Sequence, residues 1–336
     1  MTKTKTGIRE VAQRAGVSIG TVSNVLNRPQ DVSEANLVKV RAAMTELGFV
    51  RNNLARELRL GAGDSIGLVV LDIGNPFFAQ LAHDLETEAE NHGHTIIIGS
   101  SDQRIDRENR YLNLFEAQRV RGILAVPANG VTPTLKAIRT RGTPLVLYSD
   151  TPGSEGFCTV TSDTAEGGYL ATKHLIETGR SRIAFAGGPL PLVADRLAGA
   201  TRAAREHATV SLTLIETFGL TVDDGRDVAR RALALPAPVR PDAIFAANDL
   251  LAMGVLETLT SCVSVPDDIA LIGFDDISFA ASATVPLTTM RQPNLLLASE
   301  ALRLLEDELS SPAHTHETLR FVPELVIRES TRPAPR

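Results

Sequence analysis

From residue 65 to residue 272 the chain alternates short apolar runs with longer amphipathic segments. The apolar runs, of which 65–71 is the first, have the length and the residue types of buried strands. The longer segments, of which 76–92 is the first, repeat their apolar residues at helical spacing. Strands that alternate with helices form parallel, doubly wound sheets, and this run is long enough for two of them. We therefore expect an α/β body of two lobes, with a ligand cleft where the strands end.

The chain of 336 residues is long enough for two or three domains, and 43% hydrophobic with 22% charged residues is an ordinary globular composition. Its apolar runs fall short of the ~18 residues that span a bilayer, and its first residues lack the hydrophobic centre of a secretory signal. Cys158 and Cys262 lie far apart in apolar surroundings, which indicates neither a disulfide framework nor a metal site. We expect a cytoplasmic protein with no membrane partner.

The net charge of −6 argues by itself against a nucleic-acid-binding protein, but the charge is unevenly distributed. Residues 1–60 contain ten Lys and Arg against five Asp and Glu, whereas the remainder contains 24 against 35. A small basic head can meet the phosphates of DNA while a large acidic body is repelled from them. Such asymmetry also arises by chance, so the residue pattern of the head has to decide.

The pattern of the head predicts three short helices. Residues 8–15 and 19–27 each place apolar residues on one face, and Gly16 interrupts the helical pattern between them. Ser18 is a suitable N-cap for the second helix, and a third helix follows Ser33. Two short helices joined by a tight turn with a glycine form a helix-turn-helix unit, whose second helix enters the major groove of DNA. A helical hairpin used only for packing is the alternative.

Two stretches of this segment are distinctive: VAQRAGVS at residues 11–18 and TVSNVLN at residues 21–27. Together they closely resemble the sequence signature of the lac-repressor (LacI–GalR) family of bacterial regulators. The resemblance implies that Thr21 and Ser23 help anchor the recognition helix to the DNA backbone. The outward positions of this helix and its cap form the expected set of DNA contacts in the head: Ser18, Ile19, Gly20, Thr21, Ser23, Asn24 and Asn27.

Three positions match those that read base edges in this family, namely Ile19, Gly20 and Asn24. An asparagine can pair with adenine through two hydrogen bonds, and an isoleucine can pack on the methyl group of thymine. Glycine offers no side chain. The operator of this protein therefore cannot be inferred from that of another family member, because two of the three positions carry no polar group.

Residues 51–63 follow the head. A helix of the eight or nine residues at 51–59 would be too short to be stable by itself in water. They resemble the family's hinge, which becomes helical on operator DNA and inserts a leucine into the central minor groove. The resemblance places Leu58 at the inserted position, Ala55 at a close helix contact and Arg56 near a phosphate, with Asn52 as a further DNA contact. An inserted apolar side chain unstacks a base step and bends the duplex. A solvated charged linker describes the same residues away from DNA.

The resemblance continues through the body, where NPFF at 75–78, GFDD at 273–276 and PLTT at 286–289 stand where the family has them. The body therefore resembles the periplasmic sugar-binding-protein fold, and the resemblance covers nearly the whole chain. It implies that the chain crosses more than once between the lobes. We expect a first lobe of about 64–160 plus 291–328 and a second lobe of about 161–290.

The same resemblance implies five effector-binding residues: Phe77, Asp150, Arg196, Asn248 and Asp275. An ionised aspartate accepts hydrogen bonds from adjacent hydroxyl groups, arginine and asparagine supply donors, and an aromatic face covers the apolar side of a sugar ring. Each residue has a structural alternative, since the phenylalanine can be core and the others can cap turns or a helix. Their shared location in a cleft favours binding. Leu220 falls where many sugar-binding members have a stacking Phe or Trp, which points away from an ordinary hexose.

The chain has neither a GxxxxGK[ST] phosphate loop nor an HExxH zinc motif. The histidine pairs His92/His94 and His314/His316 have no evident third ligand, and we expect them at the surface. We therefore expect no enzyme, no cofactor and no metal.

The leading hypothesis is an effector-responsive transcription regulator, most often a repressor in this family, with a head at 1–50, a hinge at 51–63 and a body at 64–336. It binds a palindromic operator as a homodimer, because one head contacts only a half-site. Its effector is a small polar molecule, a sugar or a related metabolite. The alternative is a sugar-binding protein with the same body fold and no DNA role.

Overall fold

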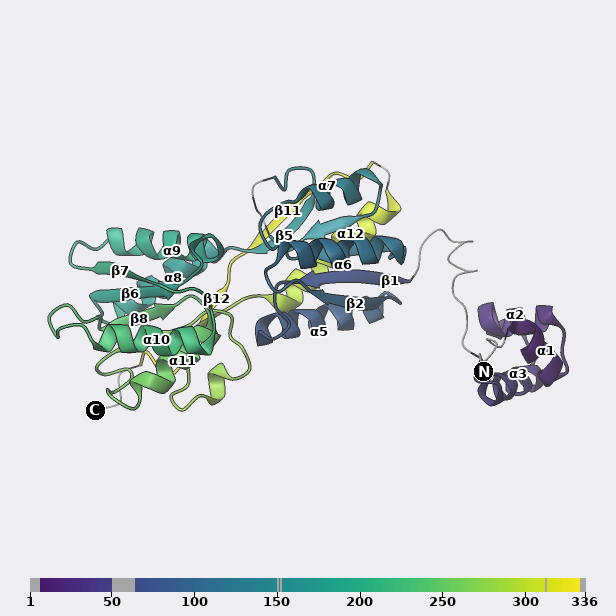
Figure 1. Ribbon diagram of the computed structural model, residues 1–336, viewed down its shortest axis with the longest axis horizontal. Coiled ribbons are helices and arrows are strands. Elements are labelled where there is room, and N and C mark those ends of the chain that lie inside the picture. Colours follow the sequence, from purple (N-terminus) through teal and green to yellow (C-terminus); the bar gives the residue numbers. More distant parts are fainter. Residues whose placement is uncertain (1–6, 50–63, 150, 152, 312, 333–336) are drawn as a thin grey trace. The chain divides into compact units, whose positions relative to one another are not determined.

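The computed structural model describes residues 7–49, 64–149, 151, 153–311 and 313–332 (Figure 1). The chain forms two compact units, Met1–Gly63 and Asp64–Arg336. Five residues singled out by the sequence lie outside the described residues, so their roles stay predictions: Asn52, Ala55, Arg56, Leu58 and Asp150. Among the described residues, no helix is long and apolar enough to cross a membrane.

The first unit contains the three predicted helices. They and a short 3-10 turn are α1 (Ile8–Ala15), α2 (Ile19–Asn27), η1 (Pro29–Asp31) and α3 (Glu34–Glu46). Gly16 ends α1 with φ +68°, a conformation that glycine adopts without strain, and the Ser18 hydroxyl accepts a 3.0 Å hydrogen bond from the backbone N–H of Thr21. The helices share a small core around the fully buried Val11, Val22 and Val40. The expected helix-turn-helix is therefore present.

The first lobe of the body contains a parallel sheet of order β11-β5-β4-β3-β1-β2. Its strands are β1 (Ser65–Val70), β2 (Thr95–Ser100), β3 (Gly122–Ala125), β4 (Leu145–Leu147), β5 (Cys158–Ser162) and β11 (Thr318–Phe321). Leucines of α5 (Pro76–Asn91) and α12 (Asn294–Ser310) pack on one face. Apolar residues of α6 (Ile105–Ala117) and α7 (Pro133–Thr140) pack on the other, as a doubly wound sheet requires.

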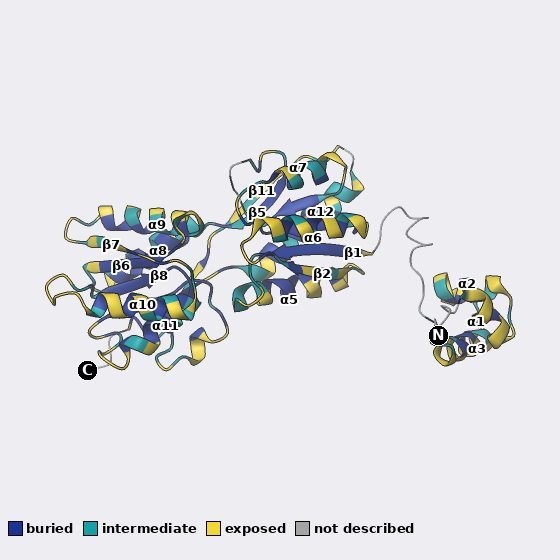
Figure 2. Cartoon of the chain, viewed as in Figure 1, coloured by how far each residue is buried: buried dark blue, intermediate teal, exposed yellow. Residues whose placement is uncertain are grey.

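The second lobe contains a parallel sheet of order β7-β6-β8-β9. Its strands are β6 (Arg182–Gly187), β7 (Ser211–Glu216), β8 (Ala243–Ala246) and β9 (Ala270–Ile272). Helices α8 (Thr164–Glu177) and α9 (Leu190–Arg205) cover one face, and α10 (Val222–Leu233) and α11 (Asp249–Leu259) cover the other. Strands β1 and β8 are buried along nearly their whole length (Figure 2). Strands β3 and β9 are buried as well. A 3-10 turn, η2 (Ala280–Ser282), follows β9.

Helices α8 and α9 approach closely because glycines face their contact. A Cβ atom on Gly168 of α8 would lie 2.1 Å from the backbone carbonyl oxygen of Arg196 in α9. A Cβ atom on Gly199 would likewise lie 1.8 Å from the carbonyl oxygen of Ala165. This backbone approach sets the position of α9 and therefore of the Arg196 side chain.

The chain crosses between the lobes through β5–α8, through β10 (Thr289–Arg291) and through β12 (Glu324–Val326). The last two strands form an antiparallel pair. The prediction that 291–328 returns to the first lobe is wrong at its end, since only α12 and β11 pack there. Strand β12 contacts α8, and the Ser330 hydroxyl donates a 2.6 Å hydrogen bond to the carbonyl of Leu271 in β9. Side-chain hydrogen bonds hold this last crossing to the second lobe, and they leave no periodic pattern in the sequence.

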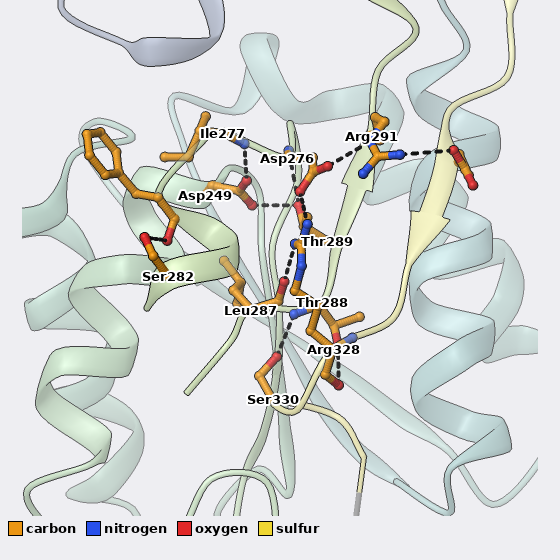
Figure 3. A network of polar contacts seen from close by, with 12 residues as sticks. Asp249, Asp276, Ile277, Ser282, Leu287, Thr288, Thr289, Arg291, Arg328 and Ser330 are labelled. Atoms are coloured by element: carbon orange, nitrogen blue, oxygen red, sulfur yellow. Dashed lines mark hydrogen bonds and ion pairs between the residues drawn. The ribbon is translucent and has the colours of Figure 1, made fainter. Parts of the chain in front are cut away.

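Asp276 joins two of these crossings (Figure 3). One carboxylate oxygen lies 2.7 Å from Nε of Arg291 in β10, and the other lies 2.6 Å from Nη2 of Arg328, which follows β12. Thr289, also in β10, donates a 2.6 Å hydrogen bond to the buried Asp249. The segments that connect the lobes are thus held by charged and polar groups at the start of α11 and after β9.

Candidate functional site

The recognition helix α2 turns its polar face outward. Ile19 is 50% exposed, and Gly20 and Asn24 are exposed as well, while Val22 and Val25 are buried. The three predicted base-reading positions therefore lie on one accessible face. Within residues 7–49 the side-chain amide of Asn24 makes no hydrogen bond, which leaves both its donor and its acceptor available for a base edge.

The remaining predicted contacts of the head also serve the helix. Ser18 and Thr21 lie with their hydroxyl oxygens 2.9 Å apart, and Asn27 donates a 2.8 Å hydrogen bond to the carbonyl of Ser23. Thr21 and Ser23 are half-buried, whereas Ser18 and Asn27 are exposed. These contacts order the two ends of α2, and their polar atoms remain close enough to the surface to meet phosphates.

A cavity of about 1030 Å³ lies in the body between residues of both lobes, near the carboxyl ends of the parallel strands. Two of the predicted effector-binding residues, Phe77 and Arg196, line it. Phe77 is the second residue of α5 in the first lobe and packs against a core cluster of the second lobe. It therefore joins the two lobes as well as covering part of the cavity.

One guanidinium nitrogen of Arg196 is anchored and another is unpaired. Its Nη1 donates a 2.7 Å hydrogen bond to the carbonyl of Ala247, and its guanidinium carbon lies 4.3 Å from the centre of the Phe274 ring. Its Nε is buried without a hydrogen-bond partner among the described residues. Burial lowers the pKa of this guanidinium, and nearby carboxylates such as Asp275 oppose that shift. A buried donor without a partner is a position that a polar ligand can satisfy.

Asp275 lies behind the cavity wall and not in its lining. It is 7% exposed, and Nε2 of Gln292, a residue that does line the cavity, donates a 2.7 Å hydrogen bond to it. Burial raises the pKa of Asp275 to about 6, although the Arg196 charge and the Gln292 hydrogen bond favour the ionised form. Its φ of +116° is rare for a residue with a side chain and is typical of functional sites.

Asn248 caps a helix, which is the structural alternative to effector binding. It is 2% exposed, and its side-chain oxygen accepts a 2.9 Å hydrogen bond from the backbone N–H of Leu251, so it caps α11. It is not among the residues that line the cavity. Leu220 likewise packs against the second-lobe core clusters.

Two hydroxyl groups in the cavity lining escaped the sequence analysis. Thr151 Oγ1 and Ser162 Oγ are buried without hydrogen-bond partners among the described residues. Single Ser and Thr residues form no pattern, but Ser162 is the last residue of β5, and this position at a carboxyl strand end is a usable signal.

The expectation that all four paired histidines lie at the surface is wrong for His94 and His314, while His316 is half-buried. His92 is exposed, but His94 is largely buried and lies 2.7 Å from the Glu306 carboxylate. The side chain of His314 is 5% exposed, and both His314 and His316 lie against Cys158. Parallel pairing of β11 with β5 brings these residues together across more than 150 positions, a distance at which local sequence carries no signal.

Comparisons with known proteins match both units. A family model described as "Bacterial regulatory proteins, lacI family" matches residues 7–52, and one described as "Periplasmic binding protein-like domain" matches residues 172–331. The HTH-type transcriptional repressor PurR of Photobacterium profundum is 33% identical over 330 residues, covering 97% of this chain and 98% of that protein. The ribose operon repressor of Escherichia coli is 34% identical over 330 residues, covering 96% and 99%.

Solved structures of similar regulators agree with these sequence matches. The transcriptional regulator CelR in complex with cellobiose has a TM-score of 0.71 at 30% identity, covering 97% of this chain and 99% of that one. A LacI family regulator from Enterococcus faecium with bound ribose has a TM-score of 0.72 at 27% identity, covering 81% and 100%. The chain therefore belongs to the LacI family of bacterial regulatory proteins, as a transcription regulator with a helix-turn-helix head and a periplasmic-binding-protein-like body.

Proposed function

We propose that this regulator is a homodimeric repressor whose operator affinity is set by a small polar effector bound in the cavity of the body. The observation that carries the proposal is the cavity between the lobes, whose lining residues Arg196, Thr151 and Ser162 each have a buried polar atom without a hydrogen-bond partner among the described residues. A stable fold rarely leaves such groups without a partner, and a bound polar molecule would supply one. The repressor function of the relatives supports a binding role for this cavity in preference to a catalytic one.

The effector is a sugar or a related metabolite with several hydroxyl groups. Hydroxyls of the protein can donate or accept, and the Nε–H of Arg196 donates, so the three groups suit a ligand that carries both kinds of partner. Phe77 adds an aromatic face at the same cavity. The relatives include a ribose operon repressor, and neighbouring structures hold ribose or cellobiose, which supports this chemical class.

Operator binding requires two chains. A single recognition helix of nine residues spans one half-site, and a two-fold symmetric operator matches a two-fold symmetric dimer. In each half-site we assign base contacts to Ile19, Gly20 and Asn24, the accessible face of α2. Because chromosomal DNA is the partner, we place the protein in the bacterial cytoplasm.

A thermal-shift screen of the full chain tests the effector assignment. A ligand that binds only the folded state raises the melting temperature, by an amount worth about 2.7 kcal/mol at a hundredfold excess over Kd. The panel contains ribose, other pentoses, hexoses, cellobiose and purine bases. We expect a sugar to raise the melting temperature of the wild type and to lose this effect in Arg196→Met. Arg205→Met, an exposed change on the same helix, is the matched control. An equal shift in Arg196→Met would contradict the assignment.

A further inference from the structure

Three metal-ligating side chains meet at one edge of the first-lobe sheet. Cys158 is the first residue of β5, and His314 and His316 lie in the segment that leads into β11. The sulfur of Cys158 lies 2.9 Å from Nε2 of His314 and 3.7 Å from Nδ1 of His316. One ligand atom from each residue falls within 4.8 Å of the other two.

We propose that Cys158, His314 and His316 form a binding site for a single borderline-soft transition-metal ion, Zn²⁺ in the first place. A thiolate with two imidazoles is a ligand set that zinc and its neighbours in the transition series prefer, and magnesium and calcium do not. Three protein ligands leave a fourth position open. The thiol gives its proton to solvent when the metal–sulfur bond forms, so each ion bound releases one proton from Cys158.

The distances suit an ion of this size. With the usual Zn–S and Zn–N bond lengths, a tetrahedral site separates sulfur from each nitrogen by about 3.6 Å. The observed distances of 2.9 and 3.7 Å bracket this value, so small rotations of the side chains are sufficient. The two imidazole rings lie 5.3 Å apart at 76° to each other, which lets both point a nitrogen at a common centre.

A carboxylate supports one of the histidines. Nδ1 of His314 lies 3.1 Å from the Asp307 carboxylate in α12. This contact keeps the imidazole proton on Nδ1 and leaves Nε2, the nitrogen beside the thiol, as a lone pair for a metal. Carboxylate–histidine pairs of this kind orient the ligand in many metal sites. The 5% exposure of the His314 side chain further limits competition from water.

The other histidine, His316, contacts Arg139. Its Nη2 lies 3.1 Å from Nε2 of His316, where an arginine can only donate. A metal on Nδ1 requires the ring proton to move to Nε2, so Arg139 has to turn away when the ion binds. An adjoining hollow of about 310 Å³, lined in part by His316, Thr318 and Glu155, gives the ion access and leaves room for water or a carboxylate as the fourth ligand.

The test uses the untagged full chain, stripped with a chelator and titrated with Co²⁺ and then with Zn²⁺. We expect one Co²⁺ per chain, with a thiolate-to-cobalt charge-transfer band and the strong visible bands of four-coordinate cobalt, all lost when Zn²⁺ displaces it. Cys158→Ser is expected to lose the charge-transfer band. Cys262→Ser, at the exposed second cysteine, keeps it and is the matched control.

Two further variants keep the test decisive if Cys158→Ser fails to fold. His316→Gln removes a partly exposed ligand, and Asp307→Asn removes only the orienting carboxylate, whose side chain is half exposed. Each is expected to weaken Zn²⁺ binding about ten- to hundredfold while melting like the wild type without metal. Absence of stoichiometric binding, a charge-transfer band that survives in Cys158→Ser, or unchanged Zn²⁺ affinity in folded His316→Gln would each overturn the proposal.

Discussion

Nε2 of Gln292 donates a 2.7 Å hydrogen bond to the Asp275 carboxylate, which connects the wall of the body cavity to a buried acid behind it. Gln292 follows β10, one of the crossings between the lobes, and Asp276 next to the acid holds Arg291 and Arg328 on two of these crossings. A ligand that contacts Gln292 therefore acts directly on the connections that set how the lobes meet. This is the physical route by which effector binding can alter the protein outside the cavity.

Asp275 is expected to make stability depend on pH. Its pKa of about 6 in the folded state lies above the value of 3.8 expected when unfolded, so the folded state holds the proton more tightly. Stability is therefore highest when Asp275 is protonated and falls as the pH rises through 6. Relative to Asp275→Asn, the wild type should gain about 1 kcal/mol between pH 7 and pH 5. Urea denaturation of both proteins at the two pH values measures this, and an unchanged difference would disprove it.

Asn24→Ala should weaken operator binding and relax sequence preference at one base pair of each half-site. The exposed amide loses a pair of hydrogen bonds to a base, which corresponds to about 1–3 kcal/mol of discrimination. Competition binding against operators mutated at each position measures the change. Asn36→Ala in α3 is the control, because it removes the same group from a different helix. A uniform loss of affinity across all sequences would instead assign Asn24 to the phosphate backbone.

Gly20→Ala should make the head more stable and lower its affinity for operator DNA. An added Cβ would meet nothing closer than the Ser18 hydroxyl oxygen at 3.5 Å, an ordinary contact. Alanine is the better helix former by about 1 kcal/mol, so the head should melt at a higher temperature. The new methyl group projects from the accessible face of α2, and operator affinity should fall. A more stable head with undiminished operator affinity would show that this position does not approach DNA closely.

Gly168→Ala should change the effector cavity by moving α9, although Gly168 does not line the cavity. The added Cβ would lie 2.1 Å from the Arg196 carbonyl oxygen, so α9 has to move away from α8. Overpacking of this kind typically destabilises a protein by about 1–3 kcal/mol, and here it also displaces the arginine that lines the cavity. Denaturant unfolding and effector titration measure the two effects. Full stability with normal effector affinity would show that this helix contact does not position Arg196.

The sequence predicted the parts of the structure that local patterns encode. Helical periodicity, Gly16 and the Ser18 cap located the head helices, and the alternation of strands and helices located both sheets. Contacts between residues that are far apart in the sequence were missed, because local patterns do not encode them. Pairing of β11 with β5 places His314 and His316 against Cys158, and no short-range pattern specifies that register.

The predicted effector residues show the same limit. A resemblance located the cavity through Phe77 and Arg196, but it could not show that Asn248 is occupied as a helix cap or that Gln292 stands between the cavity and Asp275. Those facts depend on side-chain hydrogen bonds between distant segments. The unsatisfied hydroxyls of Thr151 and Ser162 are visible only once burial is known.

The central claim is that one chain couples effector binding in the body to operator binding by the head. The direct measurement is the operator Kd, by fluorescence anisotropy, with and without saturating effector, on a DNA duplex selected from random sequences by the full chain. We predict a two-fold symmetric duplex whose Kd changes about 5- to 150-fold with effector, and an effector Kd that changes by the same factor when operator is bound. Equal operator Kd values in the presence and absence of the effector would contradict the account.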